Sequence, residues 1–480
     1  MPKIQGPTEV LVKYLTNLTY DDLPAEVVDK VKLCVYDYIG HTVYACGERP
    51  ANILCATSYE LGGNEQATTI GYGFRTNVVQ AALINGTMGH MTELDDTHLG
   101  SSSHPGDSII PAALAVAEKC KNNGKEIIAA IAAGYEIAIR AGVSVMPSHY
   151  DLGWHPSGTV NTFGAAIAAG KLLGLSVWQM RHAVGLAGAL TSGNFAHVPE
   201  RGMAKDFNTG RAAASGVYAA IIAQRGFTGS SDFFENDRGG FCRLYAREAD
   251  LSKLTNKLGQ EFKIMEVAHK PYTACRHAHG AIDATLQIVE EENIKPEEVN
   301  KINVRINATG AKFVDDKMPW LEEKGYYGSR FSAQFNVAVA LLEGREGLMN
   351  LIDKQYVRNK LDDPKVRKYI DLIGNIIWDK EIDEFPKSWA TIVEIETPRG
   401  SFSRRVDYPK GEPQCPLTID EMKAKFKRLV TAAGLSPEQE RKLTSEIFKL
   451  ETLSEVDEIM SLAVVPNISL EGVLQSSKTC

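Results

Sequence analysis

Two stretches rich in small residues decide the fold class of this chain: Gly164-Ala-Ala-Ile-Ala-Ala-Gly170 and Gly210-Arg-Ala-Ala-Ala-Ser-Gly216. Each lies in a longer segment whose apolar spacing predicts a helix, from about 159 to 173 and from about 209 to 224. Small side chains let helix backbones approach closely, so both stretches predict dense helix packing. The longest apolar run, 127–135, is well short of the ~20 residues that span a membrane. We therefore expect the core of a globular helical domain.

Working outward, most of the first 230 residues predict helices, and helices return near the end of the chain. Between them, three segments alternate apolar and polar residues as strands do, at 301–307, 390–396 and 401–406, with an apolar helix at 331–342 and an amphipathic one at 363–372. The sequence thus predicts a mainly α protein. Its large all-helical domain is built from residues 1–266 and 410–480, and a smaller α+β domain, 267–409, is inserted.

Composition excludes several classes of protein. The 480 residues are 44% hydrophobic and 23% charged, with a formal net charge of -8 and no basic block, which argues against a nucleic-acid partner. Eight cysteines are scattered without a CxxC pair, as is typical of a reducing compartment. The start of the chain lacks a secretory signal pattern. We expect a soluble cytoplasmic protein without a membrane partner.

The stretch His90-Met-Thr-Glu-Leu-Asp-Asp-Thr-His-Leu-Gly-Ser-Ser-Ser-His-Pro-Gly106 concentrates polar chemistry. Three carboxylates, two threonines and three histidines fall within these seventeen residues, between two predicted helices. Loops on a rigid scaffold often carry binding and catalytic groups. The alternative is a solvated helix end at which Asp95 or Asp96 only caps the next turn.

Three further places could add to this site. His155 precedes a predicted helix, whose N-terminal backbone N–H groups favour anions. Lys205, just before the helix at 209–224, could bind a carboxylate or act as a base. The stretch 270–280, with Arg276 and His277, lies at the seam of the two predicted domains and suits an anionic ligand. The alternatives are a packing histidine, a solvated basic loop and hinge residues.

Metal and cofactor sites find little support in the sequence. His90, Glu93, His98 and His104 show no compact ligand spacing, and the glycines near residue 71 do not complete a dinucleotide fingerprint. We therefore expect no metal and no cofactor. Carboxylates, histidines and cations together suit proton abstraction next to a carboxylate, with cations stabilising the developing charge. Elimination of water, loss of CO2 and epimerisation all remain open.

At these same positions the chain resembles the MmgE/PrpD family, which includes 2-methylcitrate dehydratase, cis-aconitate decarboxylase and iminodisuccinate epimerase. The resemblance runs along nearly the whole chain and rests on motifs in one order: Glu-Leu-Asp-Asp-Thr and His-Pro (93–97, 104–105), Trp-His-Pro (154–156), Lys205 with Gly210-Arg-Ala-Ala, Lys270-Pro-Tyr with Cys275 and His279-Gly-Ala-Ile-Asp, Phe331-Ser-Ala-Gln-Phe, and Pro409-Lys-Gly with Pro416-Leu-Thr and Lys425-Phe426.

The resemblance implies an all-α domain made from both chain ends, an inserted α+β lid, a homodimer and cofactor-free catalysis between the domains. It also implies an active site lined by Thr97, His104, His155 and Lys205, with an acidic residue of 93–96 beside them. The chain departs from the decarboxylases: Glu93 replaces an aspartate, the loop between Thr97 and His104 is one residue longer, and the lid histidine and tyrosine correspond to Cys275 and a position near Ala311.

We therefore predict a cofactor-independent lyase of a small di- or tricarboxylic acid, a hydro-lyase similar to 2-methylcitrate dehydratase. The alternatives are a cis-aconitate decarboxylase, an iminodisuccinate-type epimerase and a catalytically inactive helical dimer that acts as a binding partner. We assign catalysis to His104, Lys205, His155 and Glu93, with His104 and Lys205 moving the proton. Substrate binding is assigned to Asp96, Thr97, Arg276 and His277, and no residue is assigned to a metal.

Overall fold

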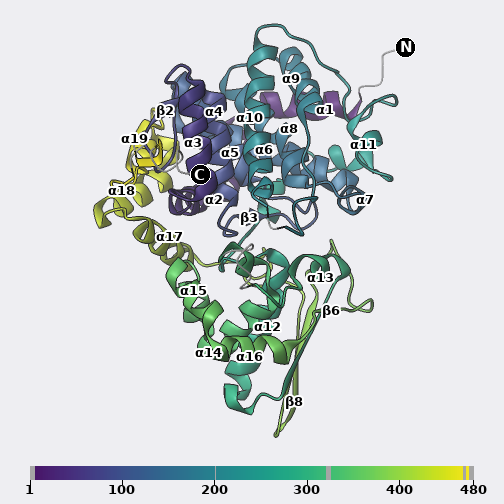
Figure 1. The fold of residues 1–480 in the computed structure, drawn as a ribbon. Helices are drawn as coiled ribbons and strands as arrows, with labels where there is room; N and C mark the ends of the chain where they lie inside the picture. Colours follow the sequence, from purple (N-terminus) through teal and green to yellow (C-terminus); the bar gives the residue numbers. More distant parts are fainter. Residues whose placement is uncertain (1–5, 201, 320–325, 469–471, 475–480) are drawn as a thin grey trace. The chain divides into compact units, whose positions relative to one another are not determined.

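The computed structural model describes residues 6–200, 202–319, 326–468 and 472–474. The chain forms two compact units. The first consists of Met1–His197, Met203–Val267 and Asp420–Cys480, and the second of Val198–Gly202 and Ala268–Ile419. Helices dominate the described chain and the sheets are small, so the predicted mainly α fold class is confirmed (Figure 1).

The first unit is helical apart from short two-residue strands. Its elements are α1 (Pro7–Asn17), α2 (Ala25–Tyr44), α3 (Arg49–Leu61), β1 (Ala67–Thr68), β2 (Arg75–Thr76), α4 (Val78–His90), β3 (Asp96–Thr97), α5 (Gly106–Cys120), α6 (Gly124–Val145), α7 (Ser148–Asp151), α8 (Pro156–Leu172), α9 (Val177–Leu190), α10 (Ala204–Gln224), α11 (Phe241–Leu244), α17 (Ile419–Ala433), α18 (Pro437–Phe448) and α19 (Asp457–Leu462).

Glycines set the distances between the central helices of this unit. A Cβ on Gly86 of α4 would lie 2.9 Å from Cα of Gly210 in α10, so the two backbones touch at this crossing. A Cβ on Gly164 of α8 would likewise lie 2.8 Å from the carbonyl oxygen of Gly134 in α6. Figure 1 shows α4, α5, α8 and α10 gathered in one group, as their mutual packing requires. The small-residue stretches thus have the core role that the sequence predicts.

The last helices return to the first ones. Phe426 of α17 stacks on Tyr36 of α2 with ring centroids 4.0 Å apart, and Lys425 Nζ lies 2.7 Å from Oδ1 of Asp37. In Figure 1 the yellow α18 and α19 accordingly lie on the side of α2 and α3, and α18 packs against α2. Both ends of the chain therefore build the same unit.

Helix α6 is long and apolar enough to cross a membrane by length and composition alone. However, 94% of its apolar window is buried inside the structure, as in the core helix of a globular domain. Its packing against α8 and α5 accounts for that apolar character.

The second unit combines helices with a four-stranded sheet. Its elements are β4 (Ala268–His269), α12 (Arg276–Glu292), β5 (Lys301–Ile306), α13 (Ala308–Val314), α14 (Ala333–Asn350), α15 (Lys354–Asp362), α16 (Pro364–Ile373), β6 (Ile377–Trp378), β7 (Thr391–Thr397) and β8 (Gly400–Val406).

The strands of this sheet follow the order β6-β5-β7-β8, with β5 and β6 parallel and the other pairs antiparallel. Alternate residues of β5 and β7, such as Val304 and Val393, are buried, and α12 and α16 pack against the sheet.

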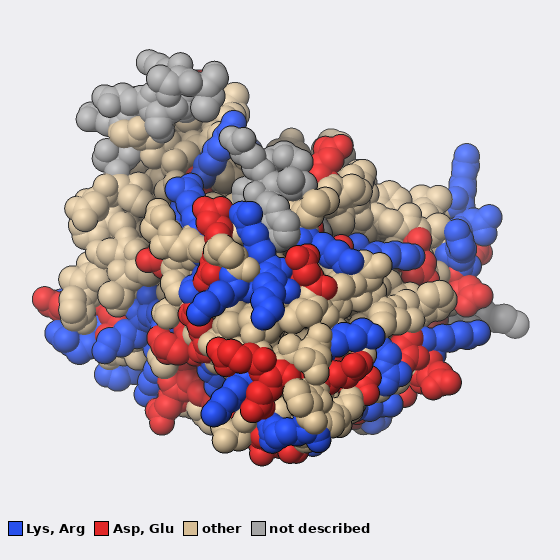
Figure 2. Space-filling model, turned by 60° about the horizontal axis from the view of Figure 1, so that its bottom comes forward, with Lys and Arg blue, Asp and Glu red and all other residues tan. Residues whose placement is uncertain are grey.

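Basic and acidic side chains are interspersed on the face of the molecule that Figure 2 shows.

The structure corrects two details of the sequence interpretation. Helix α10 begins at Ala204, so Lys205 lies in its first turn rather than before the helix. Asp206 favours that earlier start, because a carboxylate in the first turn complements the helix dipole. Arg276 and His277 lie in the first turn of α12, which begins at Arg276, and not in a loop.

Candidate active site

The loop from 91 to 105, between α4 and α5, carries Glu93, Asp96, Thr97 and His104. Loops usually lie at the surface, but Glu93 is 1%, Asp96 5% and Thr97 3% exposed. Glu93 also has a φ of 54°, in the left-handed region that residues with a Cβ rarely adopt. Such backbone conformations concentrate at functional sites. The loop is therefore a buried polar segment and not a solvated helix end.

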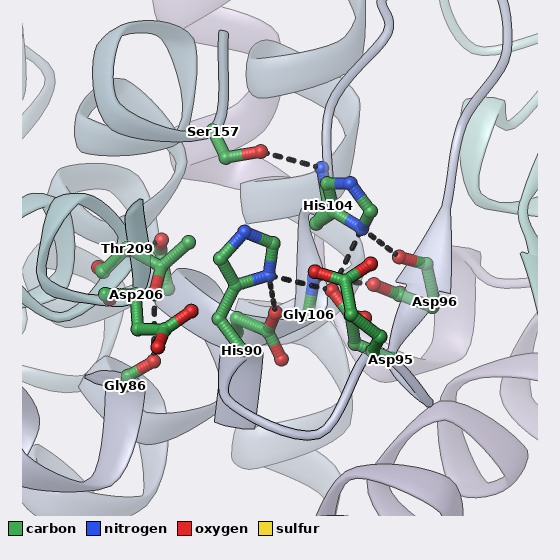
Figure 3. A network of polar contacts seen from close by, with 12 residues as sticks. Gly86, His90, Asp95, Asp96, His104, Gly106, Ser157, Asp206 and Thr209 are labelled. Atoms are coloured by element: carbon green, nitrogen blue, oxygen red, sulfur yellow. Dashed lines mark hydrogen bonds and ion pairs between the residues drawn. The ribbon is translucent and has the colours of Figure 1, made fainter. Parts of the chain in front are cut away.

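Nδ1 of His104 faces two acceptors (Figure 3). It lies 2.7 Å from Oδ2 of Asp95 and 3.0 Å from the backbone oxygen of Asp96. A carbonyl oxygen can only accept, so Nδ1 carries the proton and Nε2 is the basic nitrogen of the neutral ring. The backbone of His104 is fixed as well, because its N–H donates to Ser157 Oγ (3.0 Å) and its carbonyl accepts from Asn161 Nδ2 (2.7 Å).

His90, the last residue of α4, lies fully buried beside His104, with ring centroids 4.7 Å apart. Its Nδ1 is 2.8 Å from Oδ2 of Asp95 and 3.0 Å from Oδ2 of Asp107. On the other side of the ring, Lys205 Nζ donates to Nε2 over 2.6 Å. Burial, together with the charge of Lys205, lowers the pKa of His90 to about 3. His90 is therefore a neutral imidazole at pH 7.

One face of α10 supplies two groups to this cluster. Lys205 donates to the carboxylate of Glu93 as well as to His90. Asn208, three residues further along, projects from the same face, and its amide donates to Nδ1 of His155 over 3.0 Å. The close crossing of α10 and α4 is what brings these side chains to the end of α4.

His155 precedes α8 and is 2% exposed. Burial, with the nearby rings and Lys205, holds its pKa well below the usual value, so the ring is neutral. Because Asn208 donates to Nδ1, the ring proton is on Nε2. His155 is thus a neutral hydrogen-bond donor, whereas His104 offers a basic nitrogen. The two histidines are suited to different tasks.

Asp96 anchors the loop to its surroundings. Its Oδ1 accepts from the backbone N–H of Gly106 (3.0 Å), and its Oδ2 accepts from the hydroxyl of Tyr135 (2.6 Å). Burial raises the pKa of Asp96 to about 7, although these two hydrogen bonds act in the opposite direction. Both carboxylate oxygens, assigned to substrate from the sequence, are thus engaged by protein groups here.

Thr97 differs from Asp96 in the hydrogen bonding of its side chain. Its Oγ1 is buried and has no hydrogen-bond partner among the described residues. Buried hydroxyl groups are nearly always hydrogen-bonded. A water molecule or a bound ligand group could be the hydrogen-bond partner of Oγ1.

Arg276 and His277 belong to the second unit, unlike the other predicted site residues. Nη2 of Arg276 lies 2.6 Å from Oε1 of Glu412, and Nη1 donates to the carbonyl of Lys410 over 3.0 Å. The ring of His277 is surrounded by the aromatic rings of Phe313, Phe385 and Trp389. Within this unit, Arg276 closes a buried ion pair.

His90, Asp95 and His104 could be read as a metal site, because one ligand atom of each lies within 4.8 Å of the others. However, Oδ2 of Asp95 is 2.8 Å from Nδ1 of His90 and 2.7 Å from Nδ1 of His104. Ligand atoms of a tetrahedral zinc ion, bound at about 2.0–2.2 Å, lie roughly 3.3 Å apart. The described geometry is that of direct hydrogen bonds.

Sequence reasoning missed several members of the cluster. His90 was considered only as a metal ligand and Asp95 only as a cap or an unspecified acid. Asp107, Asn208 and Tyr135 were not considered. The helical spacing of Lys205 and Asn208 was a usable signal, whereas the approach of Asp107 and Tyr135 depends on packing.

Comparisons with known proteins agree with this picture. The family model described as the MmgE/PrpD N-terminal domain matches residues 9–253, and that of the MmgE/PrpD C-terminal domain matches residues 272–450. Similar proteins include a cis-aconitate decarboxylase-like protein of Aspergillus oryzae, 26% identical over 95% of this chain and 96% of its own length. The cis-aconitate decarboxylase of Aspergillus terreus is 25% identical over 96% of each chain, and that of Mus musculus is 24% identical over 99% of this chain and 96% of its own.

Proposed function

Because the chain belongs to the MmgE/PrpD family and is a lyase, we propose that it acts on a small di- or tricarboxylic acid, as a hydro-lyase similar to 2-methylcitrate dehydratase. The observation that carries the proposal is the hydrogen bonding of His104. With Nδ1 held by Asp95 and by the Asp96 carbonyl, Nε2 can remove a proton from a carbon next to a carboxylate.

The other groups of the cluster complete the reaction. As the C–H bond breaks toward His104, its electron pair forms the C=C bond and the C–O bond of the hydroxyl group breaks. The ammonium group of Lys205 gives the leaving hydroxide a proton, so that water departs, and it balances carboxylate charge in the meantime. In this proposal, Nε2–H of His155 and the hydroxyl of Thr97 hydrogen-bond carboxylate or hydroxyl oxygens of the substrate. The proposal requires neither a metal nor a cofactor.

A second candidate is decarboxylation of cis-aconitate, which the names of the relatives favour. Here a C–C bond to a carboxylate breaks, CO2 leaves, and the electron pair stays on the carbon skeleton, where it takes up a proton. The same His104 and Lys205 would supply that proton and the balancing charge. The departures at Glu93, at Cys275 and near Ala311 weigh against the decarboxylase.

Proton NMR in deuterated water tests the proposal. The purified protein, dialysed against EDTA, is incubated with 2-methylcitrate, citrate, cis-aconitate and iminodisuccinate. New alkene signals from a hydroxy acid would support the hydro-lyase, and itaconate with release of CO2 would support the decarboxylase. Exchange of an α-proton without alkene would instead indicate an epimerase. No reaction with any of the four would contradict the proposed substrate class.

The remaining expectations are proposals as well: a homodimer, located in the cytoplasm, with a small anionic substrate as its ligand. Sedimentation of the purified protein tests the homodimer directly, and a monomer at micromolar concentration would contradict it.

A further inference from the structure

A continuous row of hydrogen bonds joins Lys205 to His104 through two buried side chains. Lys205 Nζ contacts Nε2 of His90, Nδ1 of His90 contacts Oδ2 of Asp95, and the same oxygen contacts Nδ1 of His104. The three distances are 2.6, 2.8 and 2.7 Å. Figure 3 shows the rings of His90 and His104 on either side of the Asp95 carboxylate.

The direction of each hydrogen bond in this row follows from the chemistry of its first member. An ammonium group has protons to donate and no lone pair, so Nε2 of His90 must accept. Its ring is neutral, and the ring proton is therefore on Nδ1, which faces Oδ2 of Asp95 at 2.8 Å and, slightly further away, Oδ2 of Asp107 at 3.0 Å. Glu93 also accepts a hydrogen bond from this ammonium group.

Asp95 then receives two donors at one oxygen, Nδ1–H of His90 and Nδ1–H of His104. Two N–H donors at one oxygen stabilise the negative charge of a carboxylate more than they stabilise a neutral carboxylic acid. The arrangement therefore favours ionised Asp95. A negative charge at this point holds the His104 proton on Nδ1 and strengthens Nε2 as a base, the relation that a carboxylate has to the histidine of a catalytic triad.

We propose that His90 is a positioning residue: it passes the donor–acceptor direction set by Lys205 on to Asp95, which together with the Asp96 carbonyl holds His104 as the Nδ1–H tautomer. This inference rests on the proposed role of His104 as the base and explains how that role is set. His90 itself is not suited to be the base, because its Nε2 is occupied by Lys205 and its ring is fully buried.

NMR of protein labelled with 15N only in histidine tests the proposal without any substrate. Long-range 1H–15N spectra separate the two neutral tautomers and the imidazolium ion, and loss of a signal in H90F and H104Q assigns the two rings. We expect both rings to be Nδ1–H tautomers at pH 7.5, with His90 neutral down to pH 5. An Nε2–H tautomer or an imidazolium ion at His90 would overturn the proposal, whatever the substrate proves to be.

Variants of His90 test whether the tautomer of His104 affects turnover. We expect H90F to lower kcat at least 30-fold with KM changed less than threefold, and the two nitrogen signals of His104 to move toward each other as the second tautomer is populated. H90Q, whose amide can both accept and donate, should recover part of kcat. Unchanged His104 signals together with an unchanged kcat in H90F would overturn the proposal.

A matched control separates positioning from loss of packing. His149 is also a buried histidine with two hydrogen bonds, to the Tyr245 carbonyl and to Thr159 Oγ1, but it is not part of the row. H149F should lose stability while its kcat and the His104 signals stay near those of the unaltered protein. An equal loss of kcat in H149F and H90F would indicate a purely structural effect and would contradict the proposal.

Discussion

Each unit contains a buried cluster of charged side chains, and the two clusters differ in kind. In the second unit, Arg276 meets Glu412 through Nε (2.9 Å) and Nη2 (2.6 Å), and Trp389 Nε1 donates to the same carboxylate (2.8 Å). There one strong cation neutralises one carboxylate. In the first unit, the partners of the carboxylates include the neutral imidazole of His90 and the imidazole of His104, and an imidazole ring can both donate and accept hydrogen bonds. Buried charge alone therefore does not mark chemistry; a buried carboxylate that holds an imidazole in one tautomer does.

The largest effect should follow from removing the proposed base. We expect H104A to lower kcat about 10³-fold or more, because general base catalysis contributes about 10²–10⁴-fold. The measurement is turnover of whichever acid the NMR screen identifies, with circular dichroism to confirm folding. H182A is the control, at a histidine whose Nδ1 contacts the Gly229 carbonyl and whose ring packs on Trp178. If H104A folds normally and keeps full turnover, His104 is not the base.

Removing Arg276 from the cluster in the second unit should lower the stability of the protein. R276M leaves the Glu412 carboxylate buried without its cation, which typically costs about 3–5 kcal/mol in the free energy of unfolding. The double variant R276M/E412Q removes both charges and keeps an acceptor for Trp389, so it should recover much of that loss in urea unfolding. If Arg276 instead contacts substrate, as the sequence predicts, the stable double variant will show a raised KM.

Removing the cation of the first cluster should have a smaller effect on catalysis. We expect K205M to lower kcat/KM about 10²-fold, at the lower end of the range for loss of a general acid or of one electrostatic contact in an active site. K171M is a suitable control, because Lys171 donates only to the carbonyls of Leu15, Thr16 and Leu18 among the described residues. That variant should lose stability and retain kcat. If K205M retains its kcat/KM and K171M loses kcat, Lys205 is not the functional cation.

The smallest expected effect is the contribution of Asp96 to the pH dependence of stability. Its pKa is raised to about 7 in the folded chain from an ordinary value of 3.8, so the folded state holds a proton that the unfolded state releases between these values. This group therefore makes the protein less stable as pH rises from about 4 to 7. D96N cannot ionise, so the difference in Tm between D96N and the unaltered protein should grow in favour of D96N from pH 5 to pH 8. A constant difference would show that Asp96 is ionised throughout.

The sequence predicted much of the fold from local patterns. Apolar spacing located α16 to within one residue and α8 to within three, and alternation located β5, β7 and β8. The start of α10 was missed because Lys205-Asp-Phe-Asn lacks an apolar repeat. The buried pairing of Arg276 with Glu412 could not be foreseen, since 136 positions separate the two residues.

By itself, the sequence determined that the chain is mainly helical, that glycine and alanine lie where helices cross, and that carboxylates and histidines crowd one loop. These properties follow from residue spacing and side-chain size. Only the tertiary structure decided which of these groups are neutral, which nitrogen of each ring carries the proton, and which residues of α10 face His90. Desolvation and hydrogen-bond direction set protonation, and both depend on partners that packing brings together from distant parts of the chain.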